Sequence, residues 1–242
     1  MLLALCDLDG TFIQTSRHIA ESVPTNLVYT SSTNKKLVMT NKQLNLFNFL
    51  NSNGIVIPVT ARSLDSLQRL SSHMSFNHFK ICDHGALIYD KDNKLVEDYA
   101  DYMTELLTPI QDSMYAVSNC LNLFHNNRIF AKLKTRSVAL IETVVLIEGT
   151  AETEAHANII VSNLEKLNLQ DIYISRNGKS FSVTAFSNSY KQLACQYLIE
   201  NVPEYQDLPT LGFGDSISDL SFMFGCDFSV VPNTDSTQIS IV

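Results

Sequence analysis

Two carboxylates spaced two residues apart close the first apolar run of the chain. Leu2–Cys6 has the pattern of a strand buried on both faces, and it ends at Asp7-Leu-Asp-Gly-Thr11. Side chains two apart in an extended strand project the same way, so Asp7 and Asp9 can address one point. Two such charges raise each other's pKa unless a cation lies between them, and an oxygen-only cluster suits Mg²⁺. Gly10 permits a sharp turn with backbone amides available to an anion; the alternative is a solvated acidic turn.

Further polar groups follow other predicted elements. Thr60 ends the apolar run Ile55–Val59, and Lys191 lies in the first turn of a helix expected after Ser189. Gly214-Asp-Ser-Ile-Ser-Asp219 follows a predicted strand, and its two acids are about one helical turn apart. Each group also has a simpler reading: Thr60 as a helix-entry hydroxyl, Lys191 as an exposed lysine, and the acidic loop as a helix cap.

The elements that must position these groups alternate between strand and helix. Strands are expected at 2–6, 55–59, 79–82, 210–214 and 228–231, and helices begin near residues 41, 63, 189 and 220. This order predicts an α/β fold with a doubly wound, Rossmann-like and mostly parallel sheet. Ligands of such sheets bind at the carboxyl ends of the strands, so the polar residues that end the first three strands should share one crevice. Residues 12–39 are polar and weakly periodic, and a loop is expected there.

The alternation of strands and helices changes in the segment between Thr60 and Lys191. A hairpin is predicted at 87–99, a helix at 108–123, one or two strands at 138–147 and a helix at 155–167. Asn177-Gly178 is a strong signal for another hairpin. We therefore expect an inserted α+β domain at 86–184, and a core domain formed by 1–85 and 185–242.

Composition narrows the partners. Seventeen basic against 25 acidic residues give a net charge of −8, which argues against nucleic acid and anionic membrane surfaces as partners. The five cysteines show neither a disulfide framework nor zinc-site spacing, so reduced cytosol is the simplest location. No signal peptide or membrane-spanning run is recognised. A soluble, cytoplasmic protein is expected.

Taken together, these motifs resemble the four signatures of the haloacid dehalogenase-like (HAD) phosphohydrolases. The matching residues, in the family's order, are Asp7-Leu-Asp-Gly-Thr11, Thr60, Lys191 and Gly214-Asp-Ser-Ile-Ser-Asp219. The inserted segment is similar to a class II cap, as in the sucrose-phosphate, mannosyl-3-phosphoglycerate, trehalose-phosphate and Cof-type phosphatases. The chain departs from the common pattern at Ala61, where glycine is frequent, and at Ser218, where asparagine is frequent.

The resemblance implies a role for each residue. Asp7 would be the phosphoryl-accepting nucleophile and Asp9 the general acid and base, while Thr60 and Lys191 would bind the phosphoryl oxygens. Mg²⁺ would be held by Asp7, the Asp9 carbonyl and Asp215, with Asp219 beside it. The expected substrate contacts are Gly10, Thr11, Ala61, Arg62 and His84. For Arg62 a helix-surface ion pair, and for His84 a hydrogen bond within its loop, remain the alternatives.

The expected function is therefore a Mg²⁺-dependent phosphatase acting on a small phosphorylated metabolite, a sugar phosphate above all. Two alternatives stay open. A phosphomutase would transfer the phosphoryl group to a sugar hydroxyl, and a catalytically silent module would only bind sugar phosphates. The sequence does not choose the substrate.

Overall fold

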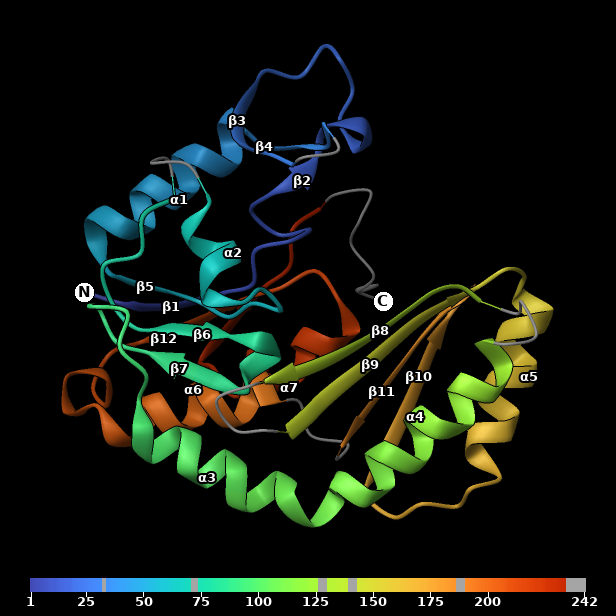
Figure 1. Cartoon of the computed structure of the whole chain (residues 1–242). Helices are drawn as coiled ribbons and strands as arrows, with labels where there is room; N and C mark the ends of the chain where they lie inside the picture. The colour runs from blue at the N-terminus through green and yellow to red at the C-terminus, as the bar shows by residue number, and fades with distance from the viewer. Residues whose placement is uncertain (32–33, 71–73, 126–129, 139–142, 186–189, 234–242) are drawn as a thin grey trace. The chain divides into compact units, whose positions relative to one another are not determined.

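The structure is a computed structural model that describes residues 1–31, 34–70, 74–125, 130–138, 143–185 and 190–233. The chain divides into two compact units (Figure 1). The core unit comprises Met1–Tyr99 and Asn188–Val242, and the second unit comprises Ala100–Ser187.

A parallel sheet forms the centre of the core unit. Its strand order is β13-β12-β1-β5, with every neighbouring pair parallel. The strands are β1 (Leu3–Cys6), β5 (Ile55–Pro58), β12 (Thr210–Phe213) and β13 (Phe228–Val230). All four residues of β1 have 0% exposure, as expected for a strand covered on both faces. The predicted mixed α/β class with a parallel sheet is confirmed.

Helices pack on this sheet, and Figure 1 shows α1 and α6 on opposite sides of it. Helix α1 begins with a capping box between Thr40 and Gln43, and α2 begins at Ser63, whose hydroxyl accepts from the Ser66 amide. The helical elements of the core unit are α1 (Asn41–Asn53), α2 (Leu64–Gln68), α6 (Tyr190–Asn201), α7 (Leu220–Met223), and the short 3₁₀ turns η1 (Ser16–His18), η2 (Asp83–Gly85), η5 (Pro203–Tyr205) and η6 (Ile217–Asp219).

The loop predicted at residues 12–39 is wrong, because this segment forms a small antiparallel sheet. Its strands are β2 (Gln14–Thr15), β3 (Thr25–Thr30) and β4 (Lys36–Thr40), in the order β2-β4-β3. Val28 and Val38 are buried, whereas Thr25, Leu27 and Thr30 of β3 are exposed. The polar residues that suggested a loop are therefore the solvent side of the strands.

The hairpin predicted at 87–99 is also different. β7 (Leu87–Tyr89) pairs antiparallel with β6 (Lys80–Cys82), and only a single bridge, Tyr89 to Leu95, continues it. The chain then enters α3 (Glu97–Leu107), a helix that the sequence did not predict. Residues 86–99 thus belong to the core unit, and β6 joins β5 through the Val59–Ile81 bridge.

The second unit is a four-stranded antiparallel sheet in the order β10-β11-β9-β8, covered on one face by α4 and α5 (Figure 1). Its hairpin forms near the predicted place, with Gly178 at φ +57° in a turn between paired residues Asn177 and Ser180. Its elements are η3 (Thr108–Ile110), α4 (Gln111–His125), β8 (Phe130–Val138), β9 (Thr143–Ala151), α5 (Glu154–Glu165), β10 (Ile172–Asn177) and β11 (Ser180–Ala185).

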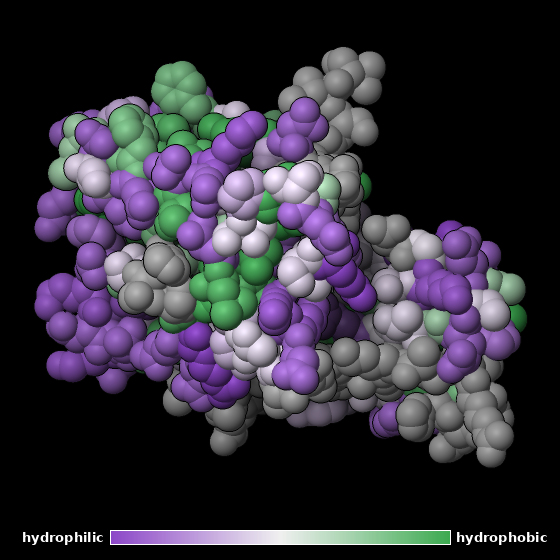
Figure 2. Space-filling view, turned by 90° about the horizontal axis from the view of Figure 1, so that it is seen from above, coloured by the Kyte–Doolittle hydropathy of each residue, from purple (hydrophilic) through white to green (hydrophobic). Residues whose placement is uncertain are grey.

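The surface is mixed. Figure 2 shows hydrophobic residues reaching the surface in patches set among hydrophilic ones. Among the helices that the structure describes, none has both the length and the apolar character needed to cross a membrane.

Candidate active site

An ion pair joins the end of the first strand to the start of α6. The Lys191 ammonium donates to Asp7 Oδ1 at 2.7 Å, although the two residues are 184 positions apart in the chain. Both side chains are only 8% exposed. Asp7 follows β1 directly, and its backbone amide donates to the Phe213 carbonyl at the end of β12, which ties the two strand ends together. The predicted convergence of these segments is thus present in the structure.

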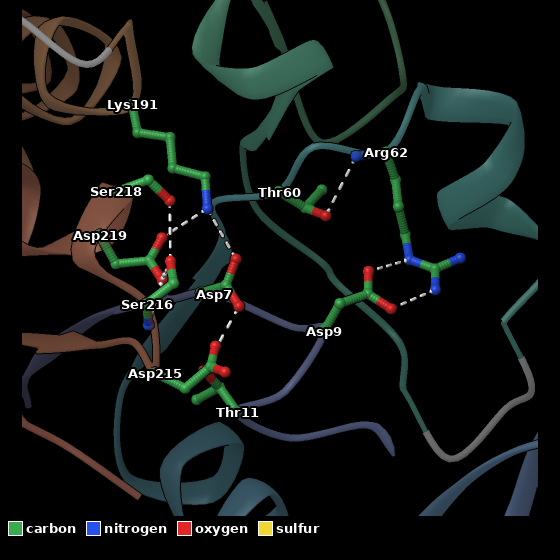
Figure 3. Close-up of polar contacts among 10 residues, drawn as sticks. All are labelled: Asp7, Asp9, Thr11, Thr60, Arg62, Lys191, Asp215, Ser216, Ser218 and Asp219. Carbon is green, nitrogen blue, oxygen red and sulfur yellow. Dashed lines mark hydrogen bonds and ion pairs between the residues drawn. The ribbon is translucent and has the colours of Figure 1, made fainter. Parts of the chain in front are cut away.

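The second partner of the same ammonium is Asp219. Lys191 Nζ lies 2.6 Å from Asp219 Oδ1, and Asp219 is 1% exposed. The other oxygen, Oδ2, accepts from the Ser216 amide at 3.1 Å and from the Ser216 hydroxyl at 2.5 Å. This is a capping box at the start of η6, so the predicted cap is confirmed and serves the acid's placement at the same time. Figure 3 shows these contacts.

Asp215 faces Asp7 across Thr11. The Thr11 hydroxyl lies 3.3 Å from Asp7 Oδ2 and 3.3 Å from Asp215 Oδ1, so it bridges the two carboxylates. Gly10 has φ +100°, and a methyl group added there would overlap the Asp215 carboxylate. Its amide donates to the Ile13 carbonyl at 2.8 Å, so that amide is already engaged rather than available to an anion.

The electrostatics of this cluster are unbalanced. Carboxylate oxygens of Asp7, Asp215 and Asp219 lie within 4.8 Å of one another, and one ammonium is present among them. Burial raises the pKa of Asp7 from 3.8 to about 7, a rise that Lys191 opposes and Asp219 adds to. Burial also raises the pKa of Asp215 from 3.8 to about 6, with Asp219 adding to it. For Lys191, burial lowers the pKa, but Asp7 and Asp219 outweigh this and raise it, so it stays charged.

The donor set fits a hard divalent cation. It is made only of oxygens, it is buried, and it carries more negative charge than its single ammonium neutralises. Lys191 Nζ also lies 5.8 Å from the centre of the Phe222 ring, which covers the ammonium without adding an oxygen ligand. A cation beside Asp7 and Asp215 would therefore offset both the burial and the repulsion by Asp219 that raise their pKa values.

The second and third strand ends meet beside this cluster. Thr60 is 1% exposed, its amide donates to the Ile81 carbonyl, and its carbonyl accepts from the His84 amide at 3.0 Å. Its hydroxyl accepts from the Arg62 amide at 3.2 Å. His84 has φ +61°. The bond from its amide to the Thr60 carbonyl is a hydrogen bond within the loop, which was one of the two interpretations of this residue. Ala61 is half-buried in the same turn.

Asp9 lies apart from the buried cluster. Its carboxylate accepts two hydrogen bonds from the Arg62 guanidinium, from Nε at 2.7 Å and from Nη2 at 2.6 Å. The Asp9 side chain is 48% exposed, and Arg62 also donates to the Ser66 hydroxyl at 3.3 Å. Arg62 therefore forms an ion pair, but with the residue expected to act as general acid rather than with an acid on the helix surface (Figure 3).

Two supporting residues escaped sequence reasoning. Gln43 donates from Nε2 to the Thr11 carbonyl at 2.9 Å and so holds the turn after β1. Thr40-x-x-Gln43 is a capping-box pattern that the sequence displays, but its reach to the first turn depends on the fold. Phe222 gave no signal beyond an apolar position on a short helix.

Comparisons with known proteins support this fold. In sequence comparisons, no family model and no curated protein match the chain. A sucrose-phosphatase from Synechocystis sp., solved with sucrose and phosphate, matches with TM-score 0.57 at 19% identity, covering 95% of this chain and 82% of that one. The C-terminal domain of a C. albicans trehalose-6-phosphate phosphatase matches with TM-score 0.58 at 14% identity, covering 91% and 72%. A haloacid dehalogenase-like hydrolase from B. subtilis gives TM-score 0.52 at 14% identity, covering 96% and 89%. The chain thus has the fold of the HAD-like hydrolases, as the motifs predicted.

Proposed function

We propose that this protein is a Mg²⁺-dependent phosphatase that hydrolyses a small phosphorylated metabolite, most specifically a sugar phosphate. One observation carries the proposal: a buried lysine bridges Asp7 and Asp219, with the Asp215 carboxylate beside them. Such a cluster combines a nucleophile, a fixed cation and oxygen ligands at one strand end, which is what phosphoryl transfer through a carboxylate requires.

In the proposed first step, Asp7 attacks phosphorus. A bond forms between a carboxylate oxygen of Asp7 and phosphorus, and the bond from phosphorus to the alcohol oxygen breaks. Asp9 donates a proton to the departing alkoxide. Because Asp9 is paired with Arg62 in the structure, its carboxyl group must leave the guanidinium in order to carry that proton.

In the second step, Asp9 takes a proton from water, and the water oxygen attacks phosphorus to release phosphate and restore Asp7. Lys191 holds the Asp7 carboxylate in place and supplies positive charge beside the phosphoryl group. Thr60 would donate its hydroxyl to a phosphoryl oxygen, since that hydroxyl acts only as an acceptor from Arg62 among the described contacts.

The residues proposed to hold Mg²⁺ are Asp7, Asp215 and the carbonyl of Asp9. When bound, the ion would neutralise and orient the phosphate oxygens. Both oxygens of Asp219 are engaged by Lys191 and Ser216, so we assign Asp219 to positioning the lysine. The expectation from the sequence placed Asp219 beside the metal, and this assignment gives it the lysine as its partner.

The proposed class of substrate follows from the similar structures. Two of the similar structures are named as a sucrose-phosphatase and a trehalose-6-phosphate phosphatase, which favours a phosphorylated sugar. The second unit has an antiparallel sheet with two helices on one face. This architecture supports our assignment of the unit as a class II cap.

The direct test is release of inorganic phosphate from p-nitrophenyl phosphate and from a panel of sugar phosphates. We expect release with Mg²⁺ and none after chelation with EDTA. Formation of an isomer without phosphate release would identify a phosphomutase instead. Tight binding of a sugar phosphate with neither reaction would identify a silent binding module.

Metal binding should also be visible in stability and its pH dependence. Asp7 and Asp215 have raised pKa values of about 7 and about 6, so the folded, metal-free protein binds protons more readily than the unfolded chain. The extra proton binding stabilises the folded state fully below about pH 4, the pKa of these carboxyl groups in the unfolded chain. This stabilisation is lost as the pH rises through the folded-state pKa values of Asp215 and Asp7. We expect the melting temperature in EDTA to fall between about pH 5 and pH 8, and saturating Mg²⁺ to restore about 2–3 kcal/mol at the higher pH.

The variant Asp215→Asn separates metal binding from a general salt effect. It should lose most of the Mg²⁺-dependent rise in melting temperature, because a neutral amide is a poorer ligand and removes part of the excess charge. The exposed residue Asp207 provides a matched control, and Asp207→Asn should keep the full rise. An equal rise in both variants would rule out Asp215 as a ligand.

A further inference from the structure

A second feature lies next to the acidic cluster, entirely within the core unit. It is a cavity of about 430 Å³ between the end of β1 and the β2–β4–β3 sheet. Asp9, Gly10, Asp215 and Arg62 line it on the catalytic side, and residues of the small sheet and of its β3–β4 turn line it on the other. The volume lies within the range of small-ligand sites, about 300–1,000 Å³. It therefore has room for more than a phosphate group.

The small sheet brings a cation into this cavity. Lys35 lies at the turn between β3 and β4, where its amide donates to the Ser31 hydroxyl and its carbonyl accepts from the Ser31 amide. Its side chain is exposed, and within the described part of the chain no acid or carbonyl engages its ammonium. The other strong cation of the cavity, Arg62, is already paired with Asp9. Lys35 is thus the cation left to meet a ligand.

Tyr29 completes this wall. It is half-buried on β3, in register with Leu37 of β4, and both residues line the cavity. An aromatic ring with a hydroxyl group provides an apolar surface and a hydrogen-bonding tip, which suits the carbon chain and hydroxyl groups of a polyhydroxy compound. The wall therefore combines one cation, one ring and polar strand residues.

We propose, on the basis of the phosphatase function argued above, that this cavity holds the leaving group of the substrate and that Lys35 recognises a second anionic group on it. The substrate class is then a phosphorylated polyhydroxy acid, with a carboxylate at the end away from the phosphate. The segment that supplies this recognition is the β2–β4–β3 sheet of the core unit.

The test compares two linear six-carbon esters that differ at one end. Gluconate 6-phosphate carries a carboxylate where glucitol 6-phosphate carries a hydroxymethyl group. We expect kcat/KM to favour the gluconate ester by about tenfold, which is the order of one charge-assisted hydrogen bond at an accessible site. Lys35→Ala should bring the two values together, mainly by raising KM for the gluconate ester, and Lys35→Arg should restore most of the preference.

Lys36 provides the matched control. It is the next residue, it is also exposed, and it does not line the cavity. Lys36→Ala should keep the preference. Equal kcat/KM values in the unmodified protein, refusal of both esters by a protein that hydrolyses p-nitrophenyl phosphate, or the same loss in both lysine variants would each overturn the inference. Failure to hydrolyse any phosphate ester with Mg²⁺ would overturn the proposed function instead.

Discussion

Asp7→Asn is expected to reduce phosphate release from p-nitrophenyl phosphate by about 10⁴-fold or more, because an amide oxygen cannot form the acyl phosphate. The shape of the side chain is kept, and its oxygen can still accept a hydrogen bond from Lys191, 2.7 Å away in the structure. The measurement is the steady-state rate with saturating Mg²⁺.

The free energy of unfolding of Asp7→Asn distinguishes a loss of catalysis from a loss of folded structure. Asp7 is one of three buried carboxylates around a single ammonium, so its neutralisation removes repulsion. We expect the free energy of unfolding in EDTA to be unchanged or higher, and the far-ultraviolet circular dichroism to be unaltered. Retention of more than about a hundredth of the activity would exclude Asp7 as the nucleophile.

Lys191→Met is expected to have the largest effect on stability. Removing the ammonium leaves Asp7 and Asp219 buried without their common partner, and breaking a buried ion pair in this way costs roughly 3–5 kcal/mol. Activity should be lost as well, because the phosphoryl oxygens lose a fixed positive charge. Urea unfolding at about pH 8 in EDTA measures the first effect.

The pH dependence identifies the cause of that loss. Without the ammonium, the folded state takes up protons on its carboxylates more readily than the unfolded chain, so the deficit should shrink as pH falls towards about 5. Saturating Mg²⁺ should also reduce it. Lys42→Met, on the exposed surface of α1, is the control and should change stability by less than about 0.5 kcal/mol. A deficit that is independent of pH would instead indicate lost packing against Phe222.

The sequence predicted the parts of the fold where one physical signal dominates. Strand β1 is a continuous apolar run because both of its faces are covered. A helix cap was one reading of the acidic loop, where the structure has a capping box between Ser216 and Asp219. The meeting of the strand ends followed from the rule that they share one edge of a parallel sheet, and the placing of Lys191 and Asp219 beside Asp7 followed from the resemblance to the HAD signatures. Their contacts agree with that expectation.

The parts that were missed depend on weaker signals. β3, with the sequence Thr-Asn-Leu-Val-Tyr-Thr, lacks the strict alternation of polar and apolar residues that indicates a strand, so its pattern resembles a loop. The sign that could have indicated it is the enrichment in β-branched and aromatic residues from Thr25 to Thr30. The pairing of Asp9 with Arg62 was not predicted, because nothing in the sequence marks Asp9, rather than an acid on the helix surface, as the partner of Arg62.

Gly85 helps to fix the position of Lys191 relative to the end of β1. It has φ +96°, and any side chain there would overlap the backbone at Tyr190 and Lys191, where α6 begins. Its carbonyl accepts a hydrogen bond from the Tyr99 hydroxyl at 2.7 Å, at the point where the chain leaves the core unit. The backbone of Gly85 therefore packs directly against the backbone at the start of α6. The distance between the Lys191 ammonium and Asp7 therefore depends on the close packing of Gly85 against the start of α6. A larger residue at position 85 would displace the ammonium from Asp7 although residue 85 itself contacts no catalytic side chain.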